Sequence, residues 1–85
     1  MGPSVEVLAG QLRYLFEDQP ELRSASVEAL TGRLNHDDRF SRARSEYPTA
    51  TDAEIAERVG EFEERITAAD VQDALARVRA DPYRD

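Results

Sequence analysis

The chain has 85 residues, of which 40% are hydrophobic and 34% are charged, so it suits one folded domain and is too short for two. Its formal net charge is −7 and all 11 basic residues are arginines, a balance that disfavours non-specific attraction to nucleic acid or anionic lipid. The absence of cysteine excludes disulfides, thiolate catalysis and thiolate metal sites.

The first predicted element is an amphipathic helix that begins after Pro3 with Ser4 as its N-cap. It must end near Asp18, because the ring of Pro20 forces Gln19 out of the helical region. Its apolar residues recur every three or four positions, which places them on one face. They are Val5, Leu8, Leu12, Leu15 and Phe16.

Two shorter helices are predicted between Pro20 and Pro48. Serine caps precede a helix over about 25–34, in which Gly32 costs roughly 1 kcal/mol relative to alanine. Residues 35–38, of sequence Asn-His-Asp-Asp, are typical of a turn that caps a third helix. That helix carries Phe40 and Tyr47 and ends at Pro48.

The strongest local signal is the capping box of Thr51 and Glu54, which predicts a helix start. The apolar residues that follow are spaced by four, three and four positions, which predicts a helix of about four turns. Thr67 repeats the cap pattern and begins a last helix that ends near Ala80, ahead of Pro82. The apolar stripe of the longer helix consists of Ile55, Val59, Phe62 and Ile66.

An offset of 28 residues aligns Pro20 with Pro48 and Leu12 with Phe40. In this alignment each of the two segments consists of a helix, a proline break and a second helix. Any two pairs of amphipathic helices share that pattern, so duplication and coincidence both stay open.

These elements predict an all-α fold, a compact orthogonal bundle of four or five short helices. No stretch alternates with the period of two that a strand requires. We expect a single helical domain over residues 1–85, with residues 1–4 flexible and 82–85 frayed. The chain has no apolar run near 20 residues and no signal-peptide pattern, so the expected location is cytoplasmic.

Candidate chemistry is sparse. The only histidine, His36, stands beside Asp37 and Asp38, but a metal site needs three or four convergent ligands, and capping or solvent exposure explains this group better. A second histidine for an organised triad is missing, and the four glycines are too scattered for a phosphate loop. We therefore expect no enzymatic activity, no metal and no cofactor.

The segment 51–79 offers an alternative, because 51–60 resembles the first helix and turn glycine of a helix-turn-helix. In this interpretation 69–79 is the recognition helix, and the chain is a DNA-binding or transcription-related regulator. Two features argue against it. The stretch between Gly60 and Thr67 exceeds a turn of three or four residues, and acidic Asp70 and Asp73 open the second helix.

The main hypothesis is a small acidic protein-interaction module: an adaptor, regulator or docking domain that binds another protein or itself. Arginines and aromatic side chains, which are enriched at protein interfaces, gather around the predicted third helix. An equal alternative is that each arginine pairs with a nearby carboxylate of the same chain. The hypothesis places an apolar groove rimmed by arginine at this patch. The candidate partner-binding residues are Arg39, Phe40, Arg42, Arg44 and Tyr47.

Overall fold

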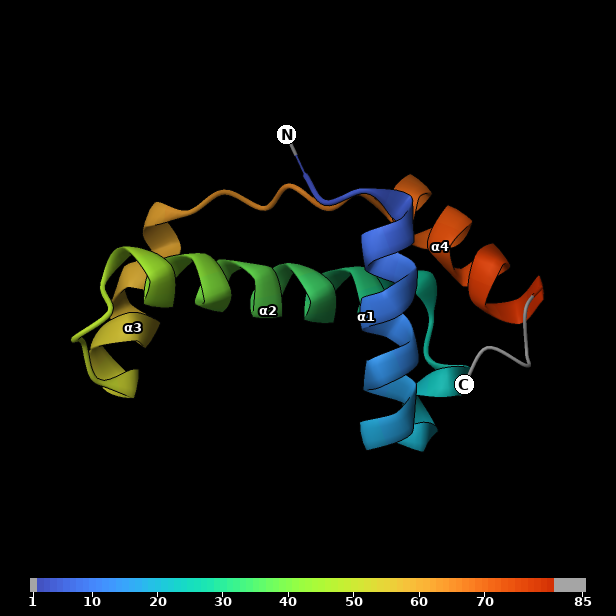
Figure 1. Cartoon of the computed structure of the whole chain (residues 1–85), viewed down its shortest axis with the longest axis horizontal. Helices are drawn as coiled ribbons and strands as arrows, with labels where there is room; N and C mark the ends of the chain where they lie inside the picture. Colours follow the sequence, from blue (N-terminus) through green and yellow to red (C-terminus); the bar gives the residue numbers. More distant parts are fainter. Residues whose placement is uncertain (1, 81–85) are drawn as a thin grey trace.

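The computed structural model describes residues 2–80, and the helical bundle predicted from the sequence is confirmed there (Figure 1). Within this range four α-helices and two short 3-10 helices follow one another. In chain order they are α1 (Val5–Asp18), η1 (Pro20–Ser24), α2 (Val27–Glu46), α3 (Asp52–Arg58), η2 (Val59–Glu61) and α4 (Ala68–Ala80). The predicted fraying of 82–85 and the stop at Pro82 lie outside the described residues.

Helix α1 begins and ends where local chemistry predicts. The hydroxyl of Ser4 accepts a hydrogen bond from the Val7 amide at 3.2 Å, which caps the first turn. At the other end, Gln19 leaves the helical region with φ −134° and ψ 82° before Pro20. The start of α4 is fixed in the same way, because the Thr67 hydroxyl accepts a hydrogen bond from the Asp70 amide at 3.2 Å.

Helix α2 corrects the prediction of two helices separated by a turn at 35–38. It is one helix of 20 residues, and the segment that was expected to form the turn lies in its middle. Two ion pairs at the favourable spacing of four residues, Arg33 with Asp37 and Arg42 with Asp38, brace this part of the helix. Asn35 does not cap a helix, because its side chain is buried and bonds a distant segment instead.

The prediction of a four-turn helix after Thr51 is wrong, because α3 has only seven residues. The capping box forms as predicted: the Thr51 amide donates to Glu54 Oε1 at 2.8 Å, and the Glu54 amide donates to Thr51 Oγ1 at 3.2 Å. After η2 the chain runs without helix over residues 62–67, which we call the connecting segment. Gly60 weakens the helix at this point, and tertiary hydrogen bonds hold the backbone that follows.

Helix α2 is the axis of the molecule, and the other helices pack at its two ends. Figure 1 shows α1 crossing α2 at a steep angle beside α4, α3 at the far end of α2, and the connecting segment running back along α2. The main core joins α1, the first half of α2, the connecting segment and α4. Its larger members are Leu8, Leu12, Leu15, Phe16, Leu30, Leu34, Ile66, Val71 and Leu75.

The two proline breaks share one backbone geometry. Tyr47, before Pro48, has φ −124° and ψ 71°, close to the angles of Gln19 before Pro20. Each of the two residues donates its amide to the carbonyl four residues back. This likeness follows from the restriction that proline places on the residue before it. The offset of 28 residues therefore matches one local motif, and the helices after the two breaks differ in length.

Candidate functional site

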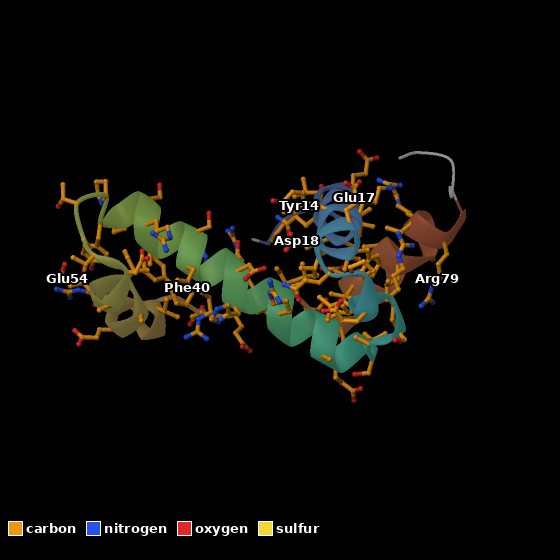
Figure 2. All side chains as sticks on the ribbon, turned by 90° about the horizontal axis from the view of Figure 1, so that it is seen from below. Tyr14, Glu17, Asp18, Phe40, Glu54 and Arg79 are labelled. Carbon is orange, nitrogen blue, oxygen red and sulfur yellow. The ribbon has the colours of Figure 1, made fainter. Side chains whose placement is uncertain are left out.

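The described surface carries an open groove of about 570 Å³ between α1 and the middle of α2, here called the α1–α2 groove. Buried Leu15 and Leu34 form its apolar floor. Figure 2 shows Tyr14 and Asp18 on the side of α1 that faces the α3 end of the molecule. The lining residues are Val7, Gly10, Gln11, Tyr14, Leu15 and Asp18 from α1, and Arg33, Leu34, Asp37, Asp38 and Ser41 from α2.

The wall formed by α1 carries exposed apolar side chains next to the polar Gln11 and Asp18. Val7, Gly10 and Tyr14 are spaced by three and four residues, so they share one face of the helix. This face lies beside the buried stripe of α1, and it leaves Val7 50% and Tyr14 73% exposed. A Cβ added at Gly10 would meet nothing within 4 Å, so the groove is open between the two larger side chains.

The rim of the groove is acidic. Asp18 lies at one end of it and has no ion-pair partner among residues 2–80. Arg33 is the only basic residue of the lining, and its guanidinium is held by Asp37 at 3.1 Å and by Gln19 Oε1 at 3.4 Å. The lining thus carries the three carboxylates of Asp18, Asp37 and Asp38 and one guanidinium that is paired internally. None of the arginines predicted to rim a groove lines this one, so that expectation stays a prediction.

The three arginines predicted to contact a partner lie on the second half of α2, and each of them pairs with a carboxylate of its own chain. Arg39 donates to the Val59 carbonyl at 3.2 Å and lies 3.8 Å from the Glu64 carboxylate. Arg42 donates to the carbonyl of Glu63 and pairs with Asp38 at 3.0 Å. Both side chains thus hold η2 and the connecting segment against α2.

The other three predicted residues lie nearer the α3 end of α2. Arg44 pairs with Asp52 at 2.9 Å and keeps half of its side chain exposed. Tyr47 donates its hydroxyl to Glu61 at 2.7 Å beneath the guanidinium of Arg58, and Phe40 stacks at a tilt on His36 with ring centroids 4.6 Å apart. All five residues lie on the second half of α2 or at its C-cap but contact different partners, and binding of another protein by them stays a prediction.

Asp38 on α2 forms the ion pair that joins this helix to the connecting segment. Its side chain is only 9% exposed, and Arg65 clasps both of its oxygens at 2.9 and 3.0 Å. Burial raises the pKa of Asp38, but the hydrogen bond from Arg65 and the charges of Arg42 and Arg65 outweigh it and hold this pKa below its ordinary value. The carboxylate therefore stabilises the fold in its ionised form.

Replacing Asp38 by asparagine is expected to lower the free energy of unfolding at pH 7 by about 1–2 kcal/mol, since both arginines are partly exposed and screened. Because the folded pKa is depressed, the contribution is full above the unfolded pKa near 4 and is lost as the pH falls through the folded pKa. Urea denaturation at pH 7 and at about pH 2.5 should show the difference between wild type and Asp38→Asn shrinking in acid. A constant difference would contradict this role for the charge.

Other chemistry is limited in the described part of the chain. Among residues 2–80 no group of three or more histidine, cysteine, aspartate or glutamate side chains is placed to hold a metal ion. His36 is exposed and contacts the ring of Phe40. No helix formed by these residues is both long and apolar enough to cross a membrane.

The helix-turn-helix arrangement considered for 51–79 is not formed. Figures 1 and 2 place α3 and α4 at opposite ends of α2, with the connecting segment between them. A helix-turn-helix needs two helices packed together across a short turn. DNA binding by this region stays an untested prediction, and a gel-shift series over salt concentration would test it.

Sequence reasoning missed Val7, Gly10, Tyr14 and Asp18 as site residues. A signal was present, because Val7 and Tyr14 are large apolar residues off the buried stripe of α1, where a solvated face would carry polar side chains. Whether another part of the chain covers such residues depends on the packing of α2 against α1.

The fold and the site define a small all-α domain with an apolar, acid-rimmed groove on its surface. Comparison of the chain with protein-family models, with curated protein sequences and with solved structures found no match.

Proposed function

We propose that the chain is a protein-interaction module, an adaptor, regulator or docking domain, that binds another protein through the α1–α2 groove. The observation that carries the proposal is Tyr14, a tyrosine 73% exposed on the wall of a groove of about 570 Å³. Tyrosine offers a large contact area at a small entropic cost and is enriched at protein interfaces. The buried Leu15 and Leu34 at the floor supply apolar surface for an entering side chain.

A different protein suits the groove better than a second copy of this chain. The chain has a net charge of −7, and the rim of the groove carries three carboxylates. Pairing two grooves face to face brings like charges together, which opposes association.

Two glycines offer a matched test. Gly10 and Gly32 both lie inside helices, and a Cβ at either meets nothing within 4 Å, but only Gly10 lines the groove. Alanine at either position should raise the free energy of unfolding by about 1 kcal/mol, because it stabilises the helix. Alanine at Gly10 should also weaken partner binding about tenfold, since its methyl occupies the space that the partner enters.

The measurement is co-purification from the native host with wild type, Gly10→Ala, Gly32→Ala and Tyr14→Ser, together with urea denaturation of each protein. A protein retained by wild type and Gly32→Ala but lost with Gly10→Ala and Tyr14→Ser identifies a partner that uses the groove. Arg44→Glu tests the patch predicted from the sequence. If Arg44→Glu abolishes capture while the groove variants retain it, the interface is the patch and not the groove.

A further inference from the structure

We infer that the occupant of the α1–α2 groove is a basic amphipathic helix of another protein, with apolar residues on one face and arginine or lysine beside them. The inference rests on the proposed function and adds the chemistry of the partner segment. Three observations carry it: the shape of the α1 wall, the free carboxylate at its end, and the internal pairing of the only basic group in the lining.

The α1 wall has the dimensions of a helix-binding surface. From Val7 to Asp18 it extends about 17 Å at the rise of an α-helix, which matches three turns of a partner helix. Gly10 leaves a gap between the side chains of Val7 and Tyr14. A ridge side chain of a packed helix enters such a gap, as in other helix pairs, and partner helices of this kind place apolar anchors every three or four residues.

The charges of the groove select a basic occupant. Asp18 is exposed and has no ion-pair partner within residues 2–80. Asp37 is half exposed and, within residues 2–80, bonds Arg33 alone, while Asp38 is already bound by Arg42 and Arg65. Asp18 and Asp37 are therefore the acceptors for incoming cations, and Arg33 stays directed toward Asp37 and Gln19.

The same charges disfavour the other occupants. A phosphate backbone meets carboxylates at the rim, and a second copy brings its own acidic rim to the groove. An acidic or neutral helix gains nothing from Asp18. These occupants are distinguishable outcomes of one experiment.

The experiment selects helix-stabilised 14-residue peptides from a random display library on the full chain. Gly10→Arg serves for counter-selection, because its side chain blocks the groove. Gly32→Arg is the matched control, since it places the same side chain on an exposed helical position outside the groove. Both variants are checked for helix content and thermal stability before use.

The expected result is a set of peptides that bind wild type and Gly32→Arg but not Gly10→Arg, and that carry lysine or arginine next to leucine-like residues. Their affinity should fall at least tenfold in Asp18→Arg and should weaken as salt is raised. Groove-dependent peptides that are neutral or acidic would overturn the basic occupant and leave the docking function in place.

Two further results would also overturn it. A selection that yields no groove-dependent peptide removes the helical occupant, while the docking function is judged separately by co-purification. A doubled mass in light scattering that Gly10→Arg abolishes and Gly32→Arg retains would make the occupant a second copy of this chain.

Discussion

Replacing Asn35 by alanine is expected to lower the free energy of unfolding by about 3 kcal/mol, because one side chain satisfies three backbone groups of a distant segment. Asn35 is 3% exposed, and its amide donates to the Ile66 carbonyl at 2.9 Å. Its oxygen accepts from the amides of Arg65 at 3.2 Å and Ile66 at 3.0 Å. Alanine removes all three hydrogen bonds, and the two groups of Ile66 are buried.

This loss is large for a chain of 85 residues, whose total stability is expected to be about 4–13 kcal/mol. The measurement is urea denaturation at pH 7, with hydrogen exchange at the amides of Arg65 and Ile66 as a local readout. Gln72→Ala is the matched control, because it removes an amide side chain from an exposed helical position and should change stability by less than about 0.5 kcal/mol. If both variants are equally stable, Asn35 does not hold the connecting segment.

The ends of the helices were predictable because they depend on neighbouring residues alone. Ser4, Thr51 and Thr67 each bond an amide three residues ahead, and Pro20 and Pro48 restrict the residue before them. None of these effects requires knowledge of the rest of the fold. The all-α class, the bounds of α1 and the start of α4 follow from such signals.

The middle of the chain was not predictable from local signals. Asn35 belongs to a residue type that caps helices, but it lies inside α2 and its side chain bonds Ile66, 31 positions away, instead of a helix end. Similarly, Ile55 and Ile66 are both buried as their spacing suggests, but they reach the core from a short helix and from an extended segment. Apolar spacing indicates which residues are buried and leaves the path of the backbone between them open.

The candidate site depends both on local sequence signals and on contacts between distant parts of the chain. The exposed apolar face of α1 can be read from the spacing of Val7, Gly10 and Tyr14. The groove exists because α2 continues past α1 as one long helix and carries Asp37 and Asp38 beside that face. A chain with a turn at 35–38 would place those carboxylates elsewhere, so the acidic rim depends on the continuity of α2.

The packing predicts two regions of different stability, which a pair of core substitutions separates. Leu12 is fully buried in the main core with α1 and α4. Ile55 is also fully buried but lies outside that cluster, near the end of α2 where Ala43 is buried. Alanine at either position leaves a cavity, for which the usual cost is about 2–5 kcal/mol. The position of the cavity decides which part of the molecule opens.

Leu12→Ala should therefore lower the global free energy of unfolding by about 3 kcal/mol and accelerate amide exchange in every helix. Ile55→Ala should accelerate exchange mainly in α3 and η2, while the amides of α1 and α4 keep most of their protection. Native-state hydrogen exchange on both variants measures this directly. Equal loss of protection in α1, α3 and α4 on replacing Ile55 would show one cooperative unit. In that case the α3 end is as firmly folded as the main core.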